Sequence, residues 1–211
     1  MARLLLVCLA FALVFPLHAR AAEDLTDRYL SVPGSYSFVR RAPEGEEAGK
    51  VKMLVFEDFL CPVCYETVTK IIPALQQKYG ERLEVTFVGY PLVAEESMVP
   101  VQDYALAREM GVEKEMQRAL FRTQFEEQLA IHTREGLARA VSHVGLDPEE
   151  FLAKLSAGAG NTRVKEDITL GEGYHIDALP GIVLDGWIRV NEVSQKNLAT
   201  IIDGLLVRKR H

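Results

Sequence analysis

The chain has 211 residues, with 24 Lys and Arg against 30 Asp and Glu, so its formal net charge is −6. Hydrophobic residues make up 48% of it and charged residues 26%. This ordinary globular composition excludes a disordered chain, a collagen-like repeat and a multispan membrane protein. The acidic balance argues against a nucleic-acid partner, which would require a basic surface. The length suits one domain, or one domain with a sizeable insertion.

The amino-terminal residues have the features of a secretory signal peptide. Arg3 precedes an apolar run over residues 4–17, and an A-x-A cleavage site ends at Ala21. The run has 14 residues, whereas a membrane-spanning helix needs about 20, so cleavage after Ala21 is favoured over a membrane anchor. The sequence therefore predicts a signal peptide over residues 1–21 and a periplasmic or secreted protein.

Cleavage at this site changes two totals. It removes two arginines and no acidic residue, so the mature chain would carry a charge of −8. It also removes Cys8, which leaves Cys61 and Cys64 of the 3 cysteines. In an exported, oxidising compartment a disulfide between these two residues can persist.

The first predicted elements form a βαβ unit. Residues 51–56 are typical of a buried strand, and residues 62–79 carry one apolar stripe at helical spacing. Pro73 should kink this helix and Gly80 should end it. Residues 83–87 alternate between apolar and polar side chains, which indicates a second strand. Strand, helix and strand in this order predict a parallel pair.

The middle of the chain is predicted to be helical throughout. One helix lies between Pro100 and Gly111, another ends at Gly145, and a third begins at Asp147 as its cap. The glycine-rich residues 158–160 indicate the exit from this helical block.

The carboxyl-terminal part returns to strands. Asp185 and Gly186 lie between two apolar runs, which predicts a two-residue hairpin. A final helix presents one apolar face from Leu198 to Leu205, and the basic residues 208–211 are most simply a solvated tail. The predicted architecture is a small α/β sheet with a helical insertion.

The one motif that carries chemistry is CPVC, residues 61–64. A disulfide exchanger needs an exposed thiolate that ionises near neutral pH and a second thiol within reach. At a helix start, the Cys61 sulfur faces the unpaired N–H groups of the first turn, and Cys64 follows one turn later. Pro62 is tolerated at the first helical position, because that N–H has no intrahelical partner. The spacing predicts a redox-active pair.

Two other interpretations of the motif are weaker. A zinc site needs about four ligands, and neither further cysteines nor paired histidines are present in the mature chain to supply them. A purely structural disulfide would close a very small loop and would constrain the unfolded chain little. We therefore predict redox chemistry that requires neither a metal nor an organic cofactor.

Three segments resemble the DsbA-type thiol-disulfide oxidoreductases, a branch of the thioredoxin superfamily. Residues 56–64 resemble the active-site segment of that family, and residues 87–92 the strand that leads into its helical insertion. Residues 174–186 are similar to its cis-proline loop and the hairpin that follows. The resemblance spans roughly residues 51–206, which is most of the mature chain.

The resemblance implies a thioredoxin fold with an inserted helical subdomain. Residues 22–92 would form the first part of the thioredoxin fold, with the CPVC motif. Residues 93–160 would form the helical insertion. Residues 161–211 would form the second part, with the cis-proline loop.

The resemblance also implies a role for each site residue. Cys61 would be the attacking cysteine and Cys64 the resolving one. Pro180 would be cis and would place the Leu179 backbone beside the sulfurs, where it could pair with a substrate peptide. Pro62 and Val63 would complete this substrate-binding surface.

Two departures from the family pattern bear on the chemistry. Val63 replaces the histidine of the strongly oxidising members, so Cys61 should be less acidic and its disulfide less oxidising. Val55 stands where many relatives carry a buried acid used in proton transfer. Glu57 and Asp58 lie nearby, but the alternation of a strand should point only one of them inward.

The predicted function is exchange of the Cys61–Cys64 disulfide with cysteines of exported polypeptides, most simply as a DsbA-like oxidase. A membrane or soluble redox partner would recycle the disulfide, no nucleic acid is involved, and a monomer is expected. The same residues could act in reverse as a reductase or isomerase, since tens of millivolts decide the direction. The alternative from another class is a non-catalytic folding helper that binds extended peptides beside Pro180.

Overall fold

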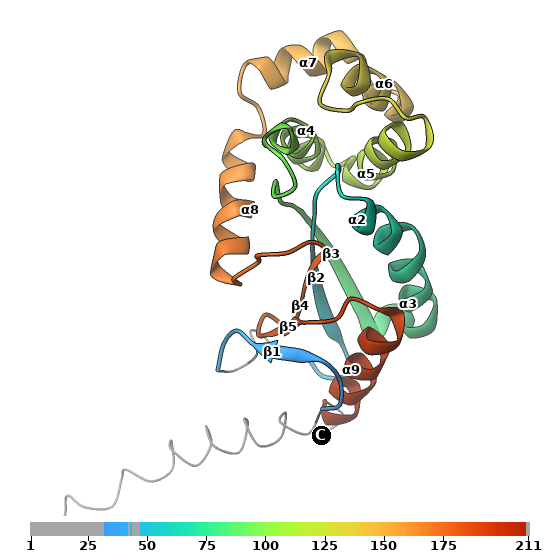
Figure 1. Cartoon of the computed structure of the whole chain (residues 1–211), viewed down its shortest axis with the longest axis vertical. Coiled ribbons are helices and arrows are strands. Elements are labelled where there is room, and N and C mark those ends of the chain that lie inside the picture. The colour runs from blue at the N-terminus through green and yellow to red at the C-terminus, as the bar shows by residue number, and fades with distance from the viewer. Residues whose placement is uncertain (1–31, 42, 44–46, 210–211) are drawn as a thin grey trace, which may run out of the picture.

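A computed structural model describes residues 32–41, 43 and 47–209 of the chain. The predicted signal peptide lies outside these residues. The described part contains no helix that is long and apolar enough to cross a membrane. It is built as a sheet flanked by helices, with a separate helical layer above it (Figure 1).

The sheet is mixed and has five strands. In spatial order they are β1 (Tyr36–Phe38), β5 (Ile188–Val190), β4 (Gly181–Leu184), β2 (Val51–Glu57) and β3 (Leu83–Gly89). β2 pairs in parallel with β3 and antiparallel with β4, which confirms the predicted βαβ unit. β1 pairs antiparallel with β5 at the edge of the sheet. The sequence does not reveal β1, because three residues are too few to show an alternation.

The helix that follows β2 is divided into three parts. α2 (Pro62–Glu66) passes into a π-helical turn, η1 (Thr67–Ile71), and then into α3 (Ile72–Tyr79). The widened turn directly precedes Pro73, which has no N–H to donate and whose ring crowds the carbonyl one turn back. The predicted irregularity therefore takes the form of a π-helical turn. Gly80 ends α3 with φ 56 and begins a short 3₁₀ turn, η2 (Gly80–Arg82).

The helical layer lies above the sheet (Figure 1). It contains η3 (Glu95–Ser97), α4 (Met98–Glu109), α5 (Glu113–Phe121), the π-helical turn η4 (Arg122–Glu126), α6 (Arg134–Val144) and α7 (Pro148–Ser156). Two predicted boundaries are confirmed. Gly145 ends α6 with φ 84, and the Asp147 carboxylate caps α7 by accepting the Glu150 N–H at 2.9 Å.

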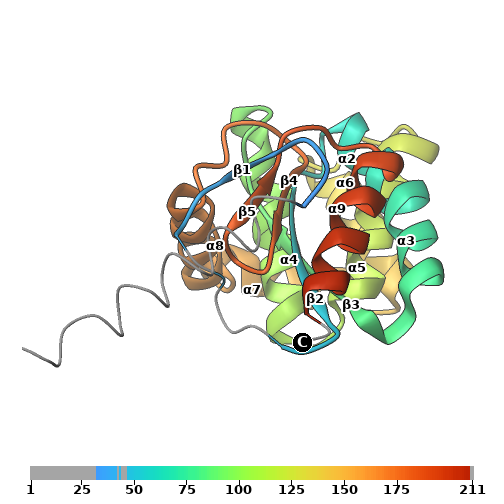
Figure 2. The ribbon, with the colours of Figure 1, turned by 90° about the horizontal axis from the view of Figure 1, so that it is seen from below.

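One helix is absent from the sequence-based prediction, namely α8 (Asn161–Gly173). The glycines at positions 158 and 160, with φ of 89 and 80, separate α7 from α8 rather than end the run of helices. α8 buries only Val164, Asp167 and Gly171, so its sequence shows no apolar stripe. It runs down beside the sheet, on the side opposite α3 (Figures 1 and 2).

The carboxyl-terminal hairpin and helix are confirmed. The turn has three residues, 185–187, rather than the two predicted, because Leu184 pairs with Ile188. Asp185 and Gly186 take φ of 50 and 71 in it. α9 (Gln195–Arg208) packs its apolar face into the core on the same side of the sheet as α3, which it contacts (Figure 2).

The basic residues at the carboxyl end are not all solvated. Lys209 is only 4% exposed, and its ammonium group lies 2.9 Å from the Asp185 carboxylate. The expectation of a solvated tail is therefore wrong for Lys209, while residues 210 and 211 lie outside the described part. The pattern of a basic run gives no sign of a buried partner that the fold supplies from a distant turn.

Candidate active site

The CPVC segment lies at the carboxyl end of β2, where the chain enters α2 (Figure 1). Cys61 is the N-cap residue, with φ −88 and ψ 112, and Pro62 takes the first helical position. The Cys61 sulfur accepts the N–H of Cys64 at 3.1 Å. The sulfur is thus bound to the free N–H groups of the first turn, as the sequence predicts.

Both cysteines are more buried than the sequence suggests. Cys61 is 5% exposed, and Cys64 is fully buried. The expectation of an exposed Cys61 sulfur is wrong, because apolar side chains of the helical layer pack around the pair. Val63, in contrast, is 53% exposed, so the surface immediately beside the sulfurs is accessible.

The environment shifts the pKa values of the two thiols in opposite directions. The pKa of Cys61 is lowered to about 7, chiefly by a hydrogen bond from the Cys64 thiol and further by the backbone N–H groups of Cys64 and Val63, against the opposing effect of burial. The pKa of Cys64 is raised, first because its thiol is bonded to the Cys61 sulfur and then because it is buried. Position 63 therefore assists through its backbone, without a polar side chain. One sulfur can ionise near neutral pH while the other holds its proton.

The loop that precedes β4 packs against the same apolar cluster as the cysteines. The Leu179–Pro180 peptide bond is cis, as expected from the resemblance. Leu179 packs against the cluster that contains Cys61 and Cys64. β4 then pairs with β2, which sets Gly181 opposite Phe56. The fold thus brings together the predicted site residues from segments more than a hundred positions apart.

Asp58 is a buried acid that stabilises the turn before the CPVC segment. Its two carboxylate oxygens accept backbone N–H groups at 2.9–3.0 Å from Leu60, Leu92 and Val93. These bonds hold the loop after β3 beside the active-site turn. Asp58 is therefore a well-compensated structural residue.

Glu57 is also buried but has fewer partners. Its Oε1 accepts a hydrogen bond from the Gln117 amide of α5 at 2.6 Å, while Oε2 has no hydrogen-bond partner among the described residues. Burial raises the pKa of Glu57 to about 8, and the charge of Cys61 adds to this effect. The expectation that only one of Glu57 and Asp58 points inward is wrong. β2 ends at Glu57, so Asp58 lies in a turn where strand alternation does not apply.

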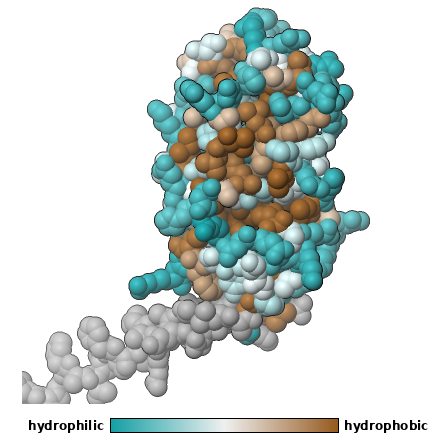
Figure 3. Space-filling model, viewed as in Figure 1, coloured by the Kyte–Doolittle hydropathy of each residue, from teal (hydrophilic) through white to brown (hydrophobic). Residues whose placement is uncertain are grey.

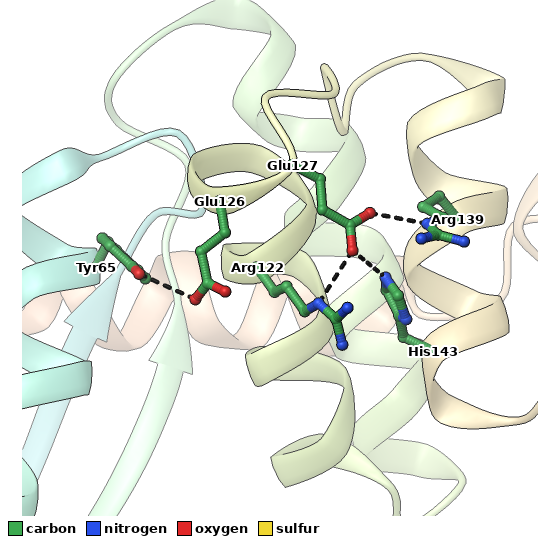
Figure 4. Close-up of polar contacts among 6 residues, drawn as sticks. All are labelled: Tyr65, Arg122, Glu126, Glu127, Arg139 and His143. Atoms are coloured by element: carbon green, nitrogen blue, oxygen red, sulfur yellow. Dashed lines mark hydrogen bonds and ion pairs between the residues drawn. The ribbon is translucent and has the colours of Figure 1, made fainter.

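Tyr65, the residue after Cys64, connects the active-site helix to the helical layer (Figure 4). Its hydroxyl donates to Glu126 Oε1 at 3.0 Å, and its ring stacks on Phe125 with centroids 5.0 Å apart. Both partners belong to the π-helical turn η4. This contact fixes α2 against the helical layer.

The residue after η4 fixes that turn in place. Glu127 accepts hydrogen bonds and forms ion pairs at 2.8–3.0 Å with side chains of its own segment and of α6, namely Arg122, Arg139 and His143 (Figure 4). The Arg139 hydrogen bond is the main cause that lowers the pKa of Glu127 to about 2, and His143 adds to it. These groups are partly exposed, so they position η4 more than they stabilise the fold.

Exposed apolar side chains lie close to the site. Asp58 ties Leu92 and Val93 to the active-site turn, and these two side chains are exposed together with Val63 and with Met98 at the start of α4. In the orientation of Figure 1, Figure 3 shows apolar surface across the middle of the molecule, at the level where the sheet meets the helical layer. A surface of this kind suits an apolar polypeptide segment.

A groove of about 750 Å³ lies beside the cysteines rather than over them. It is bounded by the active-site helix, the edge strand β3 and helices α4 and α5, and neither cysteine nor Pro180 lines it. Gln117, the partner of Glu57, does line it. The groove therefore reaches Gln117, while Glu57 itself does not line it. No group of three or more His, Cys, Asp and Glu side chains suited to a metal occurs in the described part of the chain.

Gln117 is not among the residues that the sequence predicts for the site. This residue lies 60 positions from Glu57, on a helix whose neighbouring residues Met116, Ala119 and Leu120 are all buried. A polar residue on a buried helix face is the only sequence signal that could have indicated it, and the signal does not name the partner.

A cysteine pair at a helix start, with a cis-proline loop on the same sheet and a helical insertion, defines a thiol-disulfide oxidoreductase of the thioredoxin type. Residues 100–203 match the model of the DSBA-like thioredoxin domain family. Over 146 residues, 68% of this chain and 67% of the relative, the sequence is 27% identical to the thiol:disulfide interchange protein DsbA of Pseudomonas aeruginosa. It is 25% identical to that of Burkholderia cepacia over the same length. The chain therefore contains a match to the DSBA-like thioredoxin domain and is similar in sequence to DsbA-type thiol-disulfide oxidoreductases.

Solved structures agree on the fold. The structure superposes on the oxidoreductase DsbA from Xylella fastidiosa with a TM-score of 0.70 at 20% identity, covering 85% of this chain and 98% of that one. For Pseudomonas aeruginosa DsbA the TM-score is 0.65 at 24% identity, with coverages of 84% and 93%. A Proteus mirabilis DsbA variant with a non-covalently bound peptide, PWATCDS, gives 0.60 at 16%, with coverages of 85% and 96%. The fold is a thioredoxin fold with an inserted helical subdomain.

Proposed function

We propose that this chain is an exported disulfide oxidase that passes its Cys61–Cys64 disulfide to cysteine-containing polypeptides. The observation that carries the proposal is the asymmetry of the pair. The pKa of Cys61 is lowered to about 7 and that of the buried Cys64 is raised. In the reduced enzyme, hydrogen bonds from the Cys64 thiol and from backbone N–H groups stabilise the Cys61 thiolate. They favour that state, so they make the disulfide a better oxidant.

The reaction proceeds in two exchanges. A substrate thiolate attacks the Cys61 sulfur, the Cys61–Cys64 bond breaks, and Cys64 leaves and takes up a proton. A second thiolate of the substrate then attacks the substrate sulfur of the mixed disulfide, and Cys61 leaves as a thiolate. The substrate loses two electrons and the enzyme gains them. A membrane or soluble redox partner then accepts these electrons and restores the Cys61–Cys64 disulfide.

The substrate-binding surface in this proposal consists of Pro62, Val63, the Leu179 backbone and Pro180. Its support is the exposure of Pro62 and Val63 beside the nearly buried Cys61 sulfur. The apolar side chains exposed next to it favour unfolded polypeptides, which present apolar residues together with their cysteines. The peptide that a Proteus mirabilis DsbA binds contains a cysteine, which is consistent with a substrate of this kind.

The test of direction is the reduction potential of the mature protein, residues 22–211, in glutathione buffers. We expect a value less negative than about −230 mV, in or above the range of glutaredoxins and protein disulfide isomerase. A value near the thioredoxin potential of about −270 mV, or below it, would contradict the oxidase direction and favour a reductase.

Serine variants test whether the cysteines carry the activity at all. Cys61→Ser should abolish the oxidation of a reduced, unfolded test protein. Cys64→Ser should instead accumulate a mixed disulfide through Cys61, because the resolving thiol is missing. If Cys61→Ser kept full activity in assisting folding, the redox proposal would fail and the peptide-binding helper would remain.

A further inference from the structure

The end of β2 places an acid next to the redox pair, although Val55 occupies the position where the resemblance leads one to expect it. Glu57 and Cys64 are both fully buried. The charge of Glu57 contributes to the raised pKa of Cys64, and the charge of Cys61 contributes to the raised pKa of Glu57. The protonation of the acid and that of the thiols are therefore linked.

The hydrogen bonding of Glu57 differs from that of a structural acid. The neighbouring Asp58 accepts three backbone N–H groups, whereas Glu57 accepts one side-chain N–H, from Gln117. Its Oε2 has no partner in the described part of the chain. A buried carboxylate with a single hydrogen bond is costly, but a neutral carboxyl is not, and its O–H can donate. Oε2 is thus the atom that holds the proton.

The cysteines are the main groups near Glu57 whose charge can change its affinity for a proton. The titratable groups that interact with it electrostatically are Cys61 and Cys64 of the active-site helix and Tyr104 of α4. From α5 it faces the neutral Gln117, and β3 sets Gly89 opposite it. Among the described residues no cation forms an ion pair with Glu57. A change in charge at the cysteines is therefore the main event that can change its affinity for a proton.

Gln117 connects this buried acid to the surface. Its amide donates to Glu57 Oε1 at 2.6 Å, and the same side chain, 6% exposed, lines the groove of about 750 Å³. Cys61, Cys64 and Pro180 do not line this groove. Among the described residues, Gln117 is therefore the one that both contacts the Glu57 carboxyl by a hydrogen bond and lines the groove.

We propose that Glu57 supplies the proton that Cys64 takes up and later recovers it, and that Gln117 is the positioning residue that holds the Glu57 carboxyl between the thiols and the groove. The inference rests on the proposed function, and it adds the proton path to it. When the substrate thiolate forms its bond to the Cys61 sulfur, the Cys61–Cys64 bond breaks and its electron pair goes to Cys64. Glu57 changes from carboxyl to carboxylate, and Cys64 changes from thiolate to thiol. Water in the groove then restores the proton on Glu57.

The test is the pH profile for reduction of the Cys61–Cys64 disulfide by dithiothreitol, with each rate divided by the thiolate fraction of the reagent. In the wild type the corrected rate should fall as Glu57 loses its proton, with a midpoint above the usual glutamate pKa and no higher than about 8. Glu57→Gln should be at least about tenfold slower near neutral pH and should lose this inflection, since general acid assistance contributes 10²–10⁴-fold in typical enzymes.

Gln117→Met tests the positioning role, because methionine has a similar length and no donor. The hydrogen bond from Gln117 lowers the pKa of Glu57, so its loss should move the inflection to higher pH. A residue with only a structural role would change the stability and leave the inflection in place. Asp103→Asn is the matched control. Asp103 is another fully buried carboxyl, on α4, whose oxygens have no hydrogen-bond partner among the described residues, and its replacement should not move the inflection.

A measurement on the unmodified protein removes any dependence on the folding of variants. Carboxyl ¹³C resonances of the labelled, reduced wild type should include one glutamate with a midpoint near 8, and oxidation should lower that midpoint. The inference would be overturned if Glu57→Gln had the wild-type pH profile, or if every glutamate titrated in the ordinary range. A wild-type disulfide that exchanges with no thiol would instead overturn the proposed function itself.

Discussion

Buried charge is handled in opposite ways at the two ends of β2. At its amino-terminal end, Asp185 of the hairpin turn pairs with Lys209 at 2.9 Å and also accepts the Lys52 N–H at 3.0 Å. At its carboxyl-terminal end, Glu57 has one amide donor and no cation among the described residues. Both sites are almost completely buried. The first is a compensated ion pair, and the second is an acid whose ionised form is poorly stabilised.

The ion pair at the amino-terminal end of β2 stabilises the fold, whereas the acid at the carboxyl-terminal end can take part in the reaction. The compensated pair fixes the hairpin and the end of α9 to the start of β2. An uncompensated acid has a pKa that burial moves toward neutrality, so it can take and give a proton under the conditions in which the thiols react. The contribution of Glu57 to stability is therefore expected to depend on pH. The contribution of the Asp185–Lys209 pair is expected to depend on the presence of both partners.

The largest effect is expected from breaking the ion pair. Lys209→Met leaves Asp185 buried without its cation, which should lower the free energy of unfolding by about 3–5 kcal/mol. Urea unfolding monitored by circular dichroism measures this value. The double variant Lys209→Met with Asp185→Asn should recover most of the loss, since no uncompensated charge remains. A loss below about 1 kcal/mol in the single variant would mean that the pair behaves as a solvated one.

A smaller effect is expected at the other end, and it depends on pH. Glu57 binds its proton more tightly in the folded, reduced protein than in the unfolded chain, since its pKa is about 8 instead of the usual 4.5. Its contribution to stability is fully present below pH 4.5 and is lost as pH rises toward 8, by roughly 2–4 kcal/mol. Glu57→Gln should flatten this decline and should be the more stable protein above pH 8. Identical slopes in the two proteins would show that Glu57 is not buried as described.

The smallest effect is expected at the contact that joins the reactive end to the helical layer. Tyr65→Phe removes the hydrogen bond to Glu126 but keeps the stacking on Phe125. Because the hydroxyl is exposed, the free energy of unfolding should fall by less than about 1 kcal/mol. Tyr65→Ala should cost more, since the aromatic contact is lost as well. Equal losses in the two variants would contradict the importance of the stacked ring.

The sequence predicts features that depend on neighbouring residues better than contacts between distant parts of the chain. Cys61 at a helix start, the hairpin at Asp185 and the cap at Asp147 are all predictable, because each depends on a few neighbouring residues. Lys209 and Gln117 are not, since their partners come from distant parts of the chain. α8 shows no apolar stripe because it buries few apolar side chains. The alternation rule fails at position 58, where the strand has already ended.

The asymmetry of the two thiols is tested most directly by alkylation of the reduced protein with limiting iodoacetamide across a range of pH, followed by mass spectrometry of each cysteine. We expect modification of Cys61 with a midpoint near pH 7, and essentially none of Cys64 over the same range. Equal modification of both cysteines, or a midpoint for Cys61 near the ordinary thiol pKa of about 9, would contradict the account.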